Sequence, residues 1–181
     1  MNRPWLLLIY TVPAEPSRKR AFIWREVKKV GAVYLRDGVC VLPEQPETAS
    51  ALRAIGAKVD EFDGQATLVE GARLEPARAE WLEAQSRRAR AEEYADIARE
   101  AERLLEHVAR ETEHREFTFA ELEELEADLA KLKRWTEQVR GRDYFQAGPD
   151  EHLQGLLDRC DHALGTFLDA SATREAETTP P

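Results

Sequence analysis

The sequence has little of what disulfide-rich, metal-binding and membrane proteins need. Its two cysteines, Cys40 and Cys160, lie far apart and form no C-x-x-C pair, so we expect neither a disulfide framework nor a zinc site. The apolar run WLLLIY near the N-terminus is too short for a signal peptide or a membrane span, and prolines and the basic run RKR follow it. We therefore expect a cytoplasmic protein with two buried thiols and no membrane contact.

Signatures of common enzymes are also absent. No P-loop, G-x-G-x-x-G or G-x-S-x-G motif occurs. No histidine pair has the spacing of H-E-x-x-H, although the chain contains His107, His114, His152 and His162. Thiol chemistry on an oxyanion is the least favoured function, because Cys40 falls in a strand expected to be buried. We expect a non-enzyme with no catalytic residue, no metal and no cofactor.

The chain is acidic except at its start. The net charge is −9 over 181 residues. Residues 1–45 carry eight Lys or Arg against four acids, which is a local +4 and leaves −13 for the remainder. This distribution argues against a general coat of nucleic acid and permits one local anion-binding face.

Residues 1–75 predict an α+β fold, a ferredoxin-like unit with the order βαββαβ. Asp37-Gly38 between two short β-rich runs indicates a hairpin, and Ser17 and Gly31 suit the start and the end of the first helix. The expected strands cover residues 5–11, 32–35, 39–42 and 66–70, and the expected helices cover residues 17–30 and 46–56.

Residues 76–170 predict an α-helical hairpin and a C-terminal helix packed on this unit. The first helix has an apolar stripe that includes Trp81, and Arg88 interrupts the stripe, so a bend or split is expected there. The last helix is expected to start at Gly148-Pro149-Asp150. Residues 171–181 are small and polar and end in two prolines, which predicts a disordered tail or a linker.

The middle helix has a strong start signal. Thr118 and Glu121 form a capping box, with Phe117 and Leu122 at the staple positions. An apolar seam then follows at helical spacing and predicts an antiparallel pairing with the preceding helix: Leu122, Leu125, Leu129, Leu132, Trp135 and Val139.

The helix expected over residues 17–30 carries the main candidate binding residues. Arg18, Arg25 and Lys29 fall within ~40° of one another on the side away from the sheet. Phe22 is expected beside them as an exposed aromatic. A stripe of this kind can bind phosphate or another oxyanion, and a plain solvated helix face is the alternative. Lys28 and Arg20 complete the set of candidate nucleic-acid or oxyanion ligands.

The roles of Arg20, Arg142 and Asp143 stay open. Arg20 lies with Trp24 on the flank of the same helix, where an arginine more often pairs with a carboxylate. Arg142 and Asp143, in the run RDYF, either line an anion or partner site or make local ion pairs beside a helix end.

Three runs of residues carry a family resemblance. WLLLIYTVP, EPSRKRAFIWREVKKVGAVYLRDGVCVLP and FTFAELEELEADLAKLKRW followed by RDYF resemble the N-terminal domain of the chromate resistance regulator ChrB, over residues 4–168. The sheet portion is more distantly similar to part of the phenylacetic acid repressor PaaX and to the small metal-dependent nucleases of CRISPR systems. Those nucleases place a metal-binding aspartate at the end of the first strand, where this chain has Thr11, so we expect no metal-dependent phosphodiester cleavage.

The resemblance implies a role in chromate-responsive gene regulation, with promoter DNA as a partner. Fuller ChrB proteins continue into a second domain, which would begin about where this chain stops. Two hypotheses stay open. The first is a regulator that acts through DNA or a DNA-binding partner. The second is a non-catalytic homodimeric module that takes the chromate oxyanion or a separate ChrB C-terminal domain in trans. An open four-stranded sheet has edges to cover, so we expect a homodimer.

Overall fold

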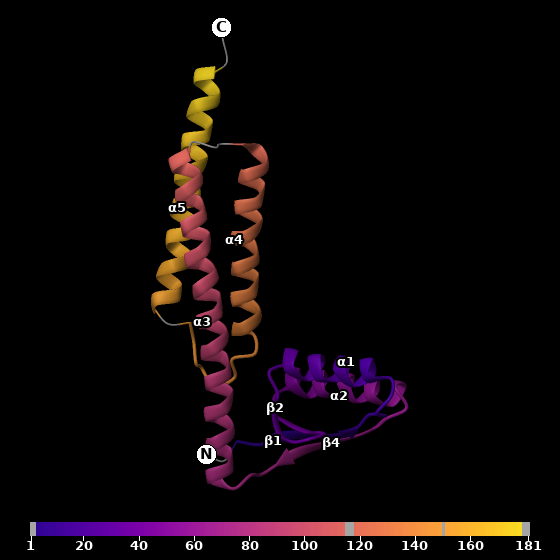
Figure 1. Cartoon of the computed structure of the whole chain (residues 1–181). Helices are drawn as coiled ribbons and strands as arrows, with labels where there is room; N and C mark the ends of the chain where they lie inside the picture. Colours follow the sequence, from indigo (N-terminus) through magenta and orange to yellow (C-terminus); the bar gives the residue numbers. More distant parts are fainter. Residues whose placement is uncertain (1–2, 115–117, 150, 179–181) are drawn as a thin grey trace. The chain divides into compact units, whose positions relative to one another are not determined.

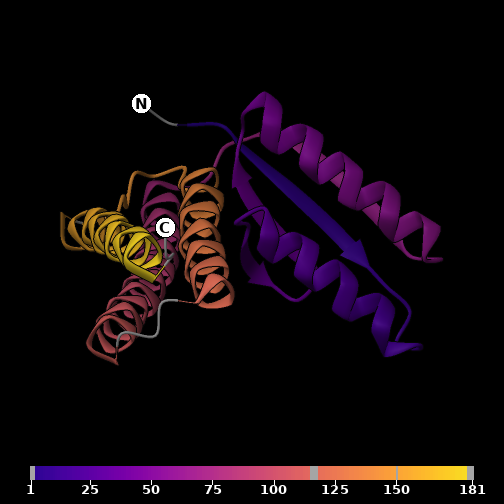
Figure 2. The ribbon, with the colours of Figure 1, turned by 90° about the horizontal axis from the view of Figure 1, so that it is seen from above.

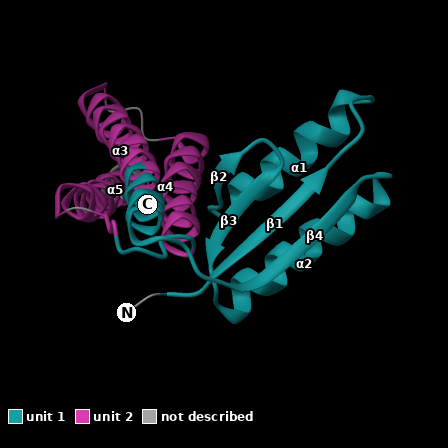
Figure 3. Ribbon diagram, turned by 90° about the horizontal axis from the view of Figure 1, so that it is seen from below, with its two compact units in different colours: residues 1–88, 142–146 teal, residues 89–141, 147–181 magenta. Residues whose placement is uncertain are grey.

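The computed structural model describes residues 3–114, 118–149 and 151–178, and the chain forms two compact units (Figure 3). Unit 1 comprises residues 1–88 and 142–146, and unit 2 comprises residues 89–141 and 147–181. The division lies inside helix α3 (Pro76–His114), later than the boundary expected at residue 75. Leu82 explains the difference, because this buried α3 residue belongs to one hydrophobic cluster with Trp5 and Val41 of the sheet.

Unit 1 has the predicted ferredoxin-like architecture. Its strands are β1 (Trp5–Thr11), β2 (Val33–Arg36), β3 (Val39–Pro43) and β4 (Gln65–Ala72), and they form an antiparallel sheet in the order β2-β3-β1-β4. Helices α1 (Ser17–Lys29) and α2 (Pro46–Glu61) lie on one face of this sheet (Figures 1 and 2). The predicted βαββαβ order is confirmed.

The main core of unit 1 forms because apolar residues recur at every second position along the strands and at every third or fourth position along the helices. Leu6 and Leu8 alternate along β1 to face the helices, and Ile23 and Val27 of α1 are fully buried one turn apart. Gly31 ends α1 with a φ of 76°, as predicted. The start of α1 differs from the prediction: Pro16 holds the N-cap position without a side-chain cap, and Ser17 is the first helical residue.

The other face of the sheet is covered in part. Trp5 is buried there and its ring stacks on that of Phe145, with 5.8 Å between ring centroids. Farther along, Ile9 on β1 and Val69 on β4 keep 43% and 36% of their surface exposed. Unit 1 therefore has an apolar strip on the side of the sheet opposite its helices.

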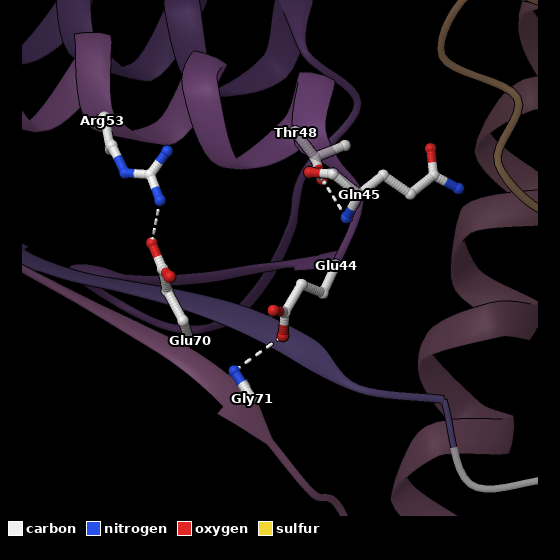
Figure 4. A network of polar contacts seen from close by, with 6 residues as sticks. All are labelled: Glu44, Gln45, Thr48, Arg53, Glu70 and Gly71. Atoms are coloured by element: carbon white, nitrogen blue, oxygen red, sulfur yellow. Dashed lines mark hydrogen bonds and ion pairs between the residues drawn. The ribbon is translucent and has the colours of Figure 1, made fainter.

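A network of polar contacts joins β4 to the start of α2 (Figure 4). Arg53 of α2 forms an ion pair with Glu70, and the Glu44 carboxylate accepts a hydrogen bond of 2.7 Å from the backbone N–H of Gly71. The N–H of Gln45 donates to Thr48 Oγ1 over 3.0 Å and thereby satisfies a free donor at the helix start. The network fixes the β4 end of unit 1, away from the candidate site described below.

Unit 2 is helical and comprises α3 from residue 89, α4 (Phe119–Arg140) and α5 (Glu151–Thr178). The predicted seam of α4 is confirmed: Leu125, Leu129, Leu132 and Val139 are buried, and Leu122 and Trp135 are partly buried against the same core. Thr118 Oγ1 accepts the cap hydrogen bond from the N–H of Glu121 over 3.2 Å. Phe117 and Asp150, named in the predicted helix starts, lie outside the described residues.

Two expectations about the helices were wrong. Helix α3 is continuous past Arg88, so the chain has no split there, and Trp81 is 41% exposed instead of facing the core. The buried stripe of α3 in unit 2 consists of Tyr94, Ile97, Ala98, Ala101, Leu104 and Val108.

Helix α5 continues to Thr178, so residues 171–178 are helical where a tail or linker was expected. This stretch contains alanine, glutamate and arginine, which favour a helix, and the first proline comes only at position 180. Within the described part of the chain, none of the helices has the length and apolar character that crossing a bilayer requires.

Candidate functional site

A cleft of about 850 Å³ lies in unit 1, between one flank of α1 and the β2–β3 hairpin. We call it the α1 cleft. Helix α2 runs beside α1 along one side only, and the opposite flank of α1 faces the β2–β3 side of the sheet (Figure 3). The cleft is lined by Tyr10, Thr11, Val12, Arg20, Trp24, Lys28, Tyr34, Asp37 and Gly38.

Gly38 shapes one side of the α1 cleft by allowing the hairpin to approach β1. The N–H of Tyr10 donates to the carbonyl of Gly38 over 2.7 Å. A Cβ at position 38 would lie 2.4 Å from the Tyr10 carbonyl oxygen, and the φ of Gly38 is 69°. Only glycine meets both conditions without strain, so the Asp-Gly turn recognised in the sequence also builds the cleft.

Two tyrosines meet in the α1 cleft. The hydroxyl oxygens of Tyr10 on β1 and Tyr34 on β2 are 2.6 Å apart, so one hydroxyl donates to the other. Burial raises the pKa of both side chains above the usual tyrosine value, and for Tyr34 the hydrogen bond to Tyr10 raises the pKa further. Both hydroxyls therefore keep their protons at neutral pH. The pair has two protons and uses one internally, which leaves one for an acceptor in the cleft.

Helix α1 contributes two cations with an aromatic between them. Arg20, Trp24 and Lys28 recur every four residues, so they share one side of the helix. Trp24 is 54% exposed. Among the described residues, the side chains of Arg20 and Lys28 make no hydrogen bond or ion pair. The arrangement offers positive charge on both sides of an accessible indole ring.

The other three predicted cations of α1 lie outside the cleft. Arg18, Arg25 and Lys29 are exposed, and we call their side of α1 the outer face. Phe22 was expected to be exposed beside them, and that expectation was wrong. Its ring packs edge-on against Phe62 at the end of α2, with 5.6 Å between centroids. The exposed aromatic of α1 is Trp24, on the flank with Arg20 and Lys28.

The run RDYF returns from unit 2 to unit 1. Tyr144 donates from its hydroxyl to the carbonyl of Val30 over 3.0 Å, and Phe145 stacks on Trp5. Arg142 and Asp143 are half-buried, each has interaction partners, and neither lines the α1 cleft. The two aromatics thus have the local structural role that the sequence favoured for the run.

Among its described residues, unit 2 contains one group with metal-ligand chemistry. His107 Nε2 lies 3.0 Å from a Glu121 carboxylate oxygen and 3.6 Å from one of Glu111, and the three ligand atoms lie within 4.8 Å of one another. This group was not predicted from the sequence, although His107 and Glu111 share the i, i+4 spacing. An imidazole and two carboxylates can hold a divalent cation, and the same contacts also join α3 to the start of α4.

Both cysteines are free and buried. Burial raises the pKa of the Cys40 thiol to about 12 and that of the Cys160 thiol to about 11. Cys160 also donates to the carbonyl of Ala101 over 3.4 Å inside unit 2. Both thiols are therefore in their unreactive, protonated form at neutral pH.

Comparison with known proteins agrees with the residue patterns. The family described as "Protein ChrB, N-terminal" matches residues 20–177. Protein ChrB of Cupriavidus metallidurans is 36% identical over 61 residues, which cover 34% of this chain and 19% of that protein. No solved structure matches the chain. Because the family match spans most of the sequence, the chain belongs to the family of ChrB N-terminal domains.

Proposed function

We propose that this protein regulates chromate resistance by binding DNA through the outer face of α1, without catalysis. Membership in the ChrB family supports a part in chromate resistance. The matched segment is a small fraction of the C. metallidurans protein, and the proposed mode of action rests on the residues of this chain.

The observation that carries the proposal is the charge of α1. The helix has six Lys or Arg and one acid, Glu26, in a chain of net charge −9. Lys19 is occupied, because its ammonium pairs with Asp63 over 2.9 Å. Arg18, Arg25 and Lys29 remain exposed together on the outer face. Exposed cations along one helix suit contacts with phosphates, which fix position without reading sequence.

The experiment compares two triple variants by fluorescence anisotropy with a labelled duplex from upstream of the gene. The test variant replaces Arg18, Arg25 and Lys29 with Ala. The control replaces Arg110, Lys131 and Arg134, three exposed cations of unit 2, and changes the net charge equally. We expect the test variant to lose binding and the control to keep it. Equal loss in both would show a net-charge effect, and absence of binding by the wild type in low salt would contradict the proposal.

A second function is a non-catalytic homodimeric binding module. The apolar strip that contains Ile9 and Val69, on the partly covered face of the sheet, favours it, since such a strip suits contact with a second copy. In this case the chromate oxyanion or a separate ChrB C-terminal domain is the partner, and DNA binding is absent. A dimer that binds no duplex would select this function.

A further inference from the structure

The α1 cleft has features that the outer face lacks. Its cations, Arg20 and Lys28, stand four residues to either side of Trp24, and the indole is more than half exposed. A cation pair attracts an anion, and arginine can bind phosphate oxygens through two N–H groups. An exposed indole offers a face on which a flat ring can stack. The ligand that satisfies both has an anionic group and an aromatic ring.

The size of the cleft distinguishes such a ligand from a bare oxyanion. A volume of about 850 Å³ falls within the range of roughly 300–1,000 Å³ typical of sites for small organic molecules. A four-oxygen anion such as chromate or phosphate would occupy a small part of it and leave Trp24 without a role. An anion that also carries a ring uses the charged and the aromatic parts of the lining together.

The remaining polar groups suit the edge of a heterocyclic base. The Tyr10–Tyr34 pair has one hydroxyl proton to donate, and the Asp37 carboxylate, at the hairpin, accepts hydrogen bonds. A nucleobase presents both acceptors and N–H donors along its edge, whereas a simple aromatic acid does not. The carboxylate also disfavours a ligand with negative charge at both ends.

We propose that the α1 cleft binds one nucleotide, with its base stacked on Trp24 and its phosphate held by Arg20 and Lys28. The tyrosine pair and Asp37 then contact the base edge. This inference does not depend on duplex binding by the outer face, because the two sets of residues have none in common.

Calorimetry at low salt tests the proposal. The probes are the four 2′-deoxynucleoside 5′-monophosphates, the matching nucleosides and inorganic phosphate. We expect the nucleotides to bind at least about tenfold more tightly than inorganic phosphate, since stacking adds to charge. Replacing Trp24 with Ala should weaken binding roughly 5- to 150-fold, and Trp24→Phe, which keeps a ring, should recover most of the loss.

Two matched variants separate this site from the outer face. Arg20→Ala should weaken nucleotide binding about tenfold or more, and Arg25→Ala on the same helix should leave it unchanged. Trp24, Arg20 and Arg25 are all exposed, so far-UV circular dichroism should show each variant folded. Equal affinity for nucleotides and inorganic phosphate, no effect of Trp24→Ala, or no binding of any nucleotide at millimolar concentration would overturn the proposal.

The source of the nucleotide is resolved by one further titration. A short single-stranded oligonucleotide that binds at least about 100-fold more tightly than its mononucleotide, with the same loss on Trp24→Ala, identifies an unpaired base of a strand as the occupant. Equal affinities for the oligonucleotide and its mononucleotide identify a free nucleotide as the occupant of the cleft. The variant with Arg18, Arg25 and Lys29 replaced should still bind the mononucleotide and the oligonucleotide. Failure of the proposed function and failure of this inference therefore give different results.

Discussion

Replacing Leu129 with Ala should destabilise the helical unit by about 3 kcal/mol. Leu129 is 5% exposed and lies in the core that α3, α4 and α5 share in unit 2. The change removes about three carbons, and transfer of each buried methylene is worth about 0.8 kcal/mol, or about 2.4 kcal/mol together. The cavity left behind raises the loss toward the range of about 2.7–5.0 kcal/mol seen for buried leucines. The higher helix propensity of alanine offsets almost none of this loss in stability, because leucine is nearly as good a helix former.

The measurement is urea denaturation followed by circular dichroism at 222 nm. Glu126→Ala is the matched control: Glu126 is exposed on the same helix three residues earlier, and its replacement should change the free energy of unfolding by at most about 0.5 kcal/mol. If Leu129→Ala costs no more than the control, Leu129 is not a core residue and the arrangement of α4 is wrong.

Three further predictions concern the cleft, the thiols and assembly. Gly38→Ala should destabilise unit 1 by at least about 1–3 kcal/mol, because of the positive φ and the clash with Tyr10; Gly155→Ala, in open space on α5, should not destabilise the chain, and a similar result for both would contradict the hairpin geometry. Cys40 and Cys160 should resist iodoacetamide at pH 8 until urea unfolds the chain. Their raised pKa values also predict that the free energy of unfolding falls as pH rises above about 9, since the unfolded thiols lose their protons at lower pH than the buried ones; rapid labelling of the native protein would refute the burial of these thiols. Sedimentation at tens of micromolar should give twice the 20.6 kDa of the chain, and a monomer mass would rule out the homodimer.

Local patterns were enough to predict most of the fold. Ile23 and Val27 are spaced for one buried helix face, Asp37-Gly38 suits only a few turn types, and the leucines of α4 have one helical period. Each of these signals depends on residues close together in the sequence. The exposed positions of Arg18, Arg25 and Lys29 followed from the same periodicity.

The α1 cleft could not be predicted in this way. Phe22 and Trp24 lie on opposite flanks of α1, and which ring is covered depends on where α2 lies. Arg20 lines a cleft only because the β2–β3 hairpin, some 15 residues later in the sequence, lies beside the flank of α1 that carries it. The return of RDYF to unit 1 and the meeting of His107 with Glu121 are tertiary features of the same kind.

The salt dependence of duplex binding is the decisive measurement of contact between the outer face and DNA phosphates. Each phosphate contact contributes about −0.9 to the slope of log K against log salt concentration, so three contacts of the outer face predict about −2.7 per protomer. Between 50 and 200 mM salt the affinity should then fall about 40-fold. The proposal predicts this slope for the wild type and loss of duplex binding across the same salt range after replacement of Arg18, Arg25 and Lys29 with Ala. A slope that the triple replacement leaves unchanged would contradict it.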